Sequence, residues 1–244
     1  LIKELMNESE NRIDLDFKQS AKIMVMDSIP FVILGSGIIL AQIIDTYSFR
    51  QIIQATSTML LSDISELYGV LSLDVDKLVM IIISLAIAIA SSSVPSVTSL
   101  FAQKDYPRTS RLIQNIVTVF SFVMLPAAVG LASIANNMYF FFYPLGNEQG
   151  PTVLILGAYL SIVLGAYTIL STVLQSMNFR RIAVRYLLIG LVLKVILQFP
   201  FVALLHANGA QLATLFAFLI TTVLMWIKIH STIIIDYVSL AKDL

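Results

Sequence analysis

The sequence predicts an all-α polytopic membrane bundle of about six transmembrane helices, and three observations support this. First, 58% of its 244 residues are hydrophobic and 12% are charged, whereas roughly a quarter are charged in a typical soluble domain. Second, six continuous apolar stretches can each cross a bilayer core, which takes about 20 helical residues. Third, lysines and arginines gather in alternate gaps between them. The stretches are Ile23–Ile44, Leu78–Ala102, Leu112–Ala132, Val153–Leu174, Ile182–Leu205 and Ala207–Ile227.

The basic residues also predict the orientation of the bundle. Cytoplasmic loops of membrane proteins are enriched in lysine and arginine, so the gaps that are poor in them are predicted to lie outside and both ends of the chain inside. The basic positions on the predicted inner side are Lys3, Arg12, Lys18, Lys22, Lys104, Arg108, Arg111, Arg180, Arg181, Lys228 and Lys242. The chain is therefore predicted to be a multi-pass membrane protein with both ends in the cytoplasm.

Three segments are predicted along the chain. Residues 1–22 are polar and mixed in charge, and are expected to form a cytoplasmic connector. Residues 23–230 form the six-helix lobe, and residues 231–244 begin a following cytoplasmic or helical segment. Because the chain starts at Leu1 instead of methionine and shows no signal-peptide core, we expect it to be a piece of a longer protein.

The first two predicted helices are separated by the longest gap. The first contains Pro30 and the run Gly35-Ser36-Gly37, which are expected to bend it and let neighbours approach closely. Residues 56–77 carry four acids and are predicted to be the one substantial outside loop, with a short interfacial turn or helix. The second helix ends in Ser91–Ser93 and Pro95, a polar and kinked half.

The remaining helices follow at short intervals. The third leads into the aromatic run Tyr139–Tyr143, expected in an interfacial belt, and residues 144–151 form a turn. The fourth carries Gly157 and Gly165, small residues that favour close packing of membrane helices. The fifth contains Pro200 and turns directly into the sixth at His206–Gly209.

Asp45 and Lys194 are the main candidates for a functional site. An acid in or near a membrane span is costly and is usually paired or faces water. Asp45 is therefore either a cavity or ion-pathway residue, or it lies beyond the helix end in outside water. Lys194 lies too deep in its helix to reach a surface easily, so we expect it to pair with Asp45 or to be held by Gln198. The alternative is a purely structural polar clamp between helices.

Three weaker candidates for the substrate or ion pathway are Gln42, Arg50 and Ser92. The planar guanidinium of Arg50 suits a phosphate, although an arginine at this depth also anchors helices at the interface. Ser92, within Ser91–Ser93, can bond sugar hydroxyls or can simply bond its own backbone.

An enzymatic function is not predicted. The chain has no cysteine, which excludes disulfides and thiolate sites. His206 and His230 are predicted on opposite sides of the membrane, so they cannot share a metal, and no phosphate loop or catalytic motif is present. We expect no cofactor and no metal. A net charge of zero also gives no electrostatic reason for a nucleic-acid partner.

Short motifs along the chain carry a family resemblance. They are Ser28–Phe31, Gln42–Asp45, Leu67–Gly69, Ser93–Pro95, Leu112–Asn115, Leu174–Gln175, Ile182–Arg185, Lys194, Gln198–Pro200 and His206–Gly209. In this order and spacing, the sequence resembles the C-terminal lobe of a flippase of the multidrug/oligosaccharidyl-lipid/polysaccharide (MOP) superfamily. The nearer match is its polysaccharide-transporter branch, with the MurJ (YtgP-like) family of lipid II flippases.

The resemblance implies a function and partners. Such proteins form two lobes around a cavity that opens alternately to each side, so a missing N-terminal lobe is expected upstream. The implied activity is translocation of a lipid-linked undecaprenyl-diphosphate oligosaccharide or peptidoglycan precursor, with membrane lipids around it. Relatives with a sodium site use an acid on the first of these helices, so a Lys194–Asp45 pair would occupy the place of that cation. Two alternatives are a multidrug/cation antiporter of the same superfamily and a non-transporting membrane scaffold.

Overall fold

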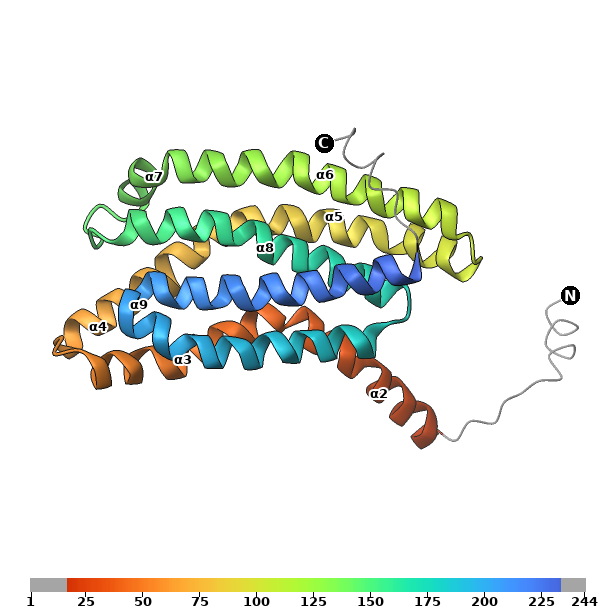
Figure 1. Cartoon of the computed structure of the whole chain (residues 1–244), viewed down its shortest axis with the longest axis horizontal. Helices are drawn as coiled ribbons and strands as arrows, with labels where there is room; N and C mark the ends of the chain where they lie inside the picture. Colours follow the sequence, from red (N-terminus) through yellow and green to blue (C-terminus); the bar gives the residue numbers. More distant parts are fainter. Residues whose placement is uncertain (1–16, 234–244) are drawn as a thin grey trace, which may run out of the picture.

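The computed structural model describes residues 17–233. The predicted following segment from residue 234 onward and most of the connector lie outside this range. Within it the chain is helical and contains no strand, which confirms the all-α prediction. The long helices lie side by side in an elongated bundle (Figure 1).

The first apolar stretch forms two helices, α2 (Phe17–Gly35) and α3 (Gly37–Thr56). They meet at a bend of 62°, at the Gly35-Ser36-Gly37 run where the sequence predicts one. Helix α3 continues to Thr56, beyond the apolar stretch that ends at Ile44, because Phe49, Ile52 and Ile53 are buried against the bundle. Asp45 therefore lies inside a helix and not in an outside loop.

The prediction that residues 56–77 form a substantial loop is wrong, although the sequence also predicts a short turn or helix within them. Only residues 57–60 lack helical structure; they are followed by α4 (Leu61–Gly69), a π-helical segment (Val70–Val75) and α5 (Asp76–Ala102). The reason is a hidden amphipathic pattern. Ile64, Leu67, Leu71 and Val75 recur at three- and four-residue spacing and are all buried, while the acids between them had suggested a solvated loop.

The third and fourth stretches form α6 (Tyr106–Ser133) and α8 (Gly150–Ser176), with the short helix α7 (Ala135–Phe142) between them.

Contrary to the prediction from the sequence, Tyr139 does not belong to an exposed interfacial belt of aromatic residues. Its ring is fully buried, and its hydroxyl donates to Asp74 at 3.0 Å. Burial, followed by this hydrogen bond and the nearby charge of Asp74, raises the pKa of Tyr139, so it stays a donor. Phe141 and Phe142 of the same run are exposed.

The fifth and sixth stretches form α9 (Arg180–Thr232), which folds back on itself (Figure 1). The backbone leaves helical geometry at His206 (φ 52°, ψ −122°), so α9 consists of two helices. Gly209 makes the close return possible, because a Cβ there would lie 1.9 Å from the carbonyl oxygen of Phe201. The predicted turn at His206–Gly209 is confirmed.

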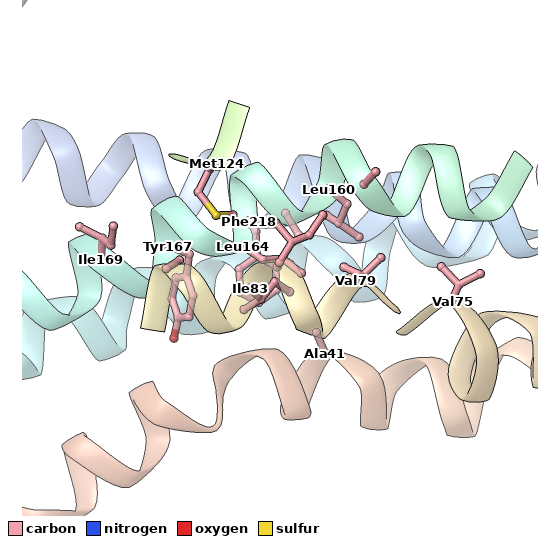
Figure 2. Packing of buried hydrophobic residues seen from close by; sticks show 14 of the residues in the cluster. Ala41, Val75, Val79, Ile83, Met124, Leu160, Leu164, Tyr167, Ile169 and Phe218 are labelled. Carbon is pink, nitrogen blue, oxygen red and sulfur yellow. The ribbon is translucent and has the colours of Figure 1, made fainter. Parts of the chain in front are cut away.

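The core surrounds α8, which contributes the central residues of the bundle. Figure 2 shows Leu160, Leu164 and Tyr167 of α8 among residues from the neighbouring helices. The rings of Tyr167 and Phe218 meet edge to face at 4.9 Å, a preferred arrangement for aromatic pairs.

The bundle is that of a multi-pass membrane protein. Within residues 17–233, four helices are long and apolar enough to cross a membrane, and the bent pair α2–α3 makes a fifth if it is counted as one span. One of the four is α9, which contains two of the predicted stretches. The basic gaps of the sequence, residues 103–111 and 175–181, lie at the same end of the bundle, and residues 57–60 and the turn within α9 lie at the other (Figure 1). The alternation of gaps rich and poor in lysine and arginine along the sequence thus corresponds to the two ends of the bundle.

His206→Gly is expected to stabilise the protein by about 1 kcal/mol. A non-glycine residue at this positive φ costs of order 1–3 kcal/mol, and the greater unfolded-state entropy of glycine offsets roughly 0.5–1 kcal/mol of the gain. The measurement is thermal unfolding of the full-length protein in detergent. His206→Ala is the matched control, because it removes the imidazole and keeps the Cβ. An equal gain in both variants would contradict the backbone explanation.

Candidate functional site

A buried ion pair joins α3 to the first half of α9. The ammonium of Lys194 lies 2.7 Å from Oδ2 of Asp45, as the sequence analysis predicts. The side chain of Lys194 is 0% exposed and that of Asp45 is 14% exposed. A pair removed this far from water is tolerated only when its remaining donors and acceptors are also satisfied.

Two further side chains complete the network around this pair. Gln198 donates from Nε2 to Oδ1 of Asp45 at 2.7 Å, and Lys194 donates to Oγ1 of Thr214 at 2.5 Å. Lys194 and Gln198 are four residues apart and share a helix face. Thr214 lies on the second half of α9, and its own hydroxyl donates to the carbonyl of Ala210 at 2.9 Å. The network therefore ties α3 to both halves of α9.

A second carboxylate, Asp76 at the start of α5, lies close to the first. Gln42 donates from Nε2 to Oδ2 of Asp76 at 2.9 Å, and Gln42 precedes Asp45 by three residues on the same face of α3. Both acids line a cavity of about 40 Å³ together with Tyr68, Gln211 and Thr214. At roughly 10–15 Å³ for each, it has room for about three or four waters.

Gln211, which lines the cavity, and Gln198, which belongs to the adjoining network, have unmet hydrogen-bonding capacity. Oε1 of Gln198 and Oε1 of Gln211 are buried without a hydrogen-bond partner among the described residues. Asp45, Asp76 and Lys194 together give two negative charges and one positive. Buried acceptors of this kind normally meet water or a cation. A cluster of three or more histidine, cysteine, aspartate or glutamate side chains suited to a metal is not found within residues 17–233.

Helix α4 covers the cavity toward the end of the bundle where residues 57–60 lie. The hydroxyls of Tyr68 and Thr46 are 2.7 Å apart, and the ring of Tyr68 lies 5.6 Å from that of Phe49. These contacts hold α4 against α3 close to the acids.

The bend between α2 and α3 lies toward the opposite end of α3. The hydroxyl of Tyr167 donates to the carbonyl oxygen of Leu34 at 2.7 Å. A Cβ at Gly37 would lie 2.2 Å from this hydroxyl oxygen, so glycine permits the close approach. Tyr167 thus stabilises a break that leaves backbone groups without helical partners.

The structure brings together only some of the predicted site residues. Asp45, Lys194, Gln198 and Gln42 belong to the network, whereas Arg50 is exposed and does not line the cavity. Ser92 is also exposed, and its hydroxyl donates to the carbonyl of Ile89 at 2.9 Å, the self-bonding alternative.

Sequence reasoning missed two members of the site. Asp76 was assigned to the loop that proved to be helical, and Gln211 was given no role. A glutamine inside an apolar span is a usable signal, because membrane helices use such side chains to bond one another.

Comparison with known proteins adds one relationship. The chain is 31% identical over 204 residues to the lipid II flippase MurJ of Bacillus subtilis (strain 168). The aligned part covers 82% of this chain and 37% of that protein, so the chain spans a little over a third of its relative's length. No protein-family model matches the chain. The similarity confirms the resemblance that the sequence motifs indicate.

Proposed function

The chain is a relative of the lipid II flippase MurJ, and on this basis we propose that it is one lobe of a flippase for a lipid-linked peptidoglycan precursor or oligosaccharide. The single observation that carries this proposal is the 31% identity over 82% of the chain. The substrate would be an undecaprenyl-diphosphate sugar, moved across the cytoplasmic membrane by alternating access. The other lobe would come from a part of the protein that precedes this chain.

Orientation follows from the distribution of basic residues. We place the end of the bundle with the gaps 103–111 and 175–181 in the cytoplasm, because lysine and arginine are enriched on that side. The end with residues 57–60 would then face outward. The start of α2 and the end of α9 lie at the cytoplasmic end (Figure 1), in keeping with both termini inside.

The ion-pair network is proposed to hold one of two states of the lobe. Alternating access needs an element with two discrete arrangements, and α3 is suited to this role. It is hinged at the bend beside Gly37 and fastened to α9 through Asp45. Lys194 supplies a positive charge fixed to the chain, where a transporter coupled to sodium would need the ion. Transport by this lobe is therefore proposed not to depend on sodium bound at Asp45.

The other functions considered from the sequence are less well supported. A non-transporting scaffold would be expected to have a sealed apolar centre, whereas this bundle contains a polar cavity with two acids. The similarity to a flippase also gives no support for an antiporter.

Complementation tests the proposed function. The full-length protein that contains this chain is expected to rescue bacteria depleted of their lipid II flippase, and Asp45→Ala is expected to lose rescue because it leaves Lys194 buried without its carboxylate. Arg50→Gln is the matched control, because Arg50 is exposed and outside the cavity. Rescue is scored as growth, with each protein measured in the membrane fraction. A wild-type protein that reaches the membrane and fails to rescue would contradict lipid II as the cargo.

A further inference from the structure

A basic cavity lies at the turn between α8 and α9, away from the ion-pair network. It has a volume of about 470 Å³ and is lined by Asn178, Phe179, Arg180, Arg181, Ile182 and Arg185. Asn178 adopts φ 63°, which lets the chain reverse within a few residues. The turn that carries the cavity lies at the end of the bundle with the basic gaps (Figure 1). We call it the arginine pocket.

The charges of the arginine pocket are of one sign. Three of its six lining residues are arginines and none is acidic. Arg181 and Arg185 are exposed, and no described acid forms an ion pair with either. The pocket also adjoins the start of α9, whose first turn has no side-chain cap, so the partial positive charge of the helix adds to that of the arginines.

An exposed apolar stripe runs from the arginine pocket along α9. Arg181 and Arg185 are followed on the same face by Leu188, Val192 and Phe199, at the three-, four- and seven-residue intervals that align side chains on a helix. These three side chains are 49%, 61% and 56% exposed. With the arginines at the depth of the headgroups, the stripe would extend to the depth of the acyl chains, because a helix rises about 1.5 Å per residue.

We propose that the arginine pocket binds the phosphodiester headgroup of an anionic phospholipid, with the acyl chains lying along the stripe. The planar guanidinium group forms paired hydrogen bonds with phosphate oxygens. A freely diffusing phosphate would use the arginines but would gain nothing from the apolar stripe. The combination of both features on one helix face therefore favours a lipid.

Neighbouring contacts reinforce the positive potential and connect the pocket to the rest of the lobe. The ammonium of Lys228 lies 4.7 Å from the ring centroid of Phe179, a cation–π contact that holds a further positive charge beside the pocket. The guanidinium of Arg180 lies 5.5 Å from the ring centroid of Phe31 on α2. A lipid bound here would contact the side chains that pack α2 against α9.

The test measures lipid binding to the purified full-length protein in neutral detergent. Dioctanoyl-phosphatidylglycerol is titrated against the wild type, the double variant Arg181→Gln/Arg185→Gln and Arg111→Gln. Arg111 is the matched control, because it is an exposed arginine at the same end of the bundle and outside the pocket. With about a fivefold effect for each basic residue near an anionic lipid, the double variant is expected to bind roughly 20- to 30-fold more weakly. Arg111→Gln is expected to bind as the wild type does.

Further measurements distinguish a lipid headgroup from free phosphate, and loss of binding from loss of folding. Dioctanoyl-phosphatidylcholine is expected to bind much more weakly than the glycerol lipid, and inorganic phosphate or pyrophosphate is expected not to compete at millimolar concentrations. Equal binding of phosphatidylcholine, competition by pyrophosphate, or unchanged binding by the double variant would each overturn the proposal. Thermal unfolding without lipid shows whether the double variant is folded, and Arg181→Lys/Arg185→Lys, which keeps both charges, is expected to retain most of the binding.

Discussion

Lys194→Met is expected to destabilise the full-length protein by about 3 kcal/mol and to abolish rescue of flippase-depleted cells. The substitution keeps most of the side-chain volume but removes the ammonium 2.7 Å from Asp45. Breaking one partner of a buried ion pair costs about 3–5 kcal/mol, because the other charge stays buried without compensation. The low end applies here, since Asp45 is 14% exposed and Gln198 still bonds it. The measurement is unfolding in detergent, alongside complementation.

The double variant Asp45→Leu/Lys194→Met separates a structural clamp from a functional site. Replacing both charges with apolar groups of similar size is often neutral or stabilising, so stability is expected to return close to that of the wild type. Rescue is expected to remain absent, because the double variant lacks the ion pair that is proposed to hold one of the two states of the lobe. If the stable double variant does rescue, the ion pair is only a clamp and the proposed role in transport is wrong.

The fold could be predicted well because the length of apolar stretches and the positions of basic gaps reflect physical limits of the bilayer. Each predicted stretch is helical in the structure. The first forms the bent pair α2–α3, and the last two form the halves of α9, joined at the predicted turn His206–Gly209. The failure at residues 56–77 has a physical cause as well. Four acids dominate the composition there. One face of the helical segment is nevertheless buried, with Ile64, Leu67 and Leu71 packed against the bundle, and this packing outweighs the polar composition.

The site could be predicted only in part. Asp45 and Lys194 stood out because a charge in an apolar span needs a partner. Arg50 and Ser92 lie outside the cavity. Membrane helices are apolar on every side, so the sequence predicts the depth of a residue but little about the face on which it lies. Asp76 could join the site only once α4 and the π-helical segment were known to be helical, since these bring it beside Gln42.

The bend between α2 and α3, beside Tyr167, is the second place where a single substitution is expected to change stability strongly. It contains two glycines, Gly35 and Gly37, whose surroundings differ, so each can be tested against the other. Gly37→Ala is expected to destabilise the protein by about 2 kcal/mol, within the usual range for overpacking. Its Cβ would lie 2.2 Å from the hydroxyl oxygen of Tyr167 and 3.1 Å from Cδ1 of Leu187. Tyr167 is 2% exposed and packs against Phe218, so it has little room to move.

Gly35→Ala is the control for this prediction, because a Cβ at Gly35 meets no heavy atom within 4 Å. Both variants change glycine to alanine within three residues of each other, so they share the change in backbone entropy. Gly35→Ala is expected to unfold at or slightly above the wild-type temperature, and Gly37→Ala clearly below it. Adding Tyr167→Phe to Gly37→Ala removes the closest atom and is expected to recover part of the loss. Equal destabilisation by the two alanines would show that flexibility of the bend, and not the contact with Tyr167, explains the glycine at position 37.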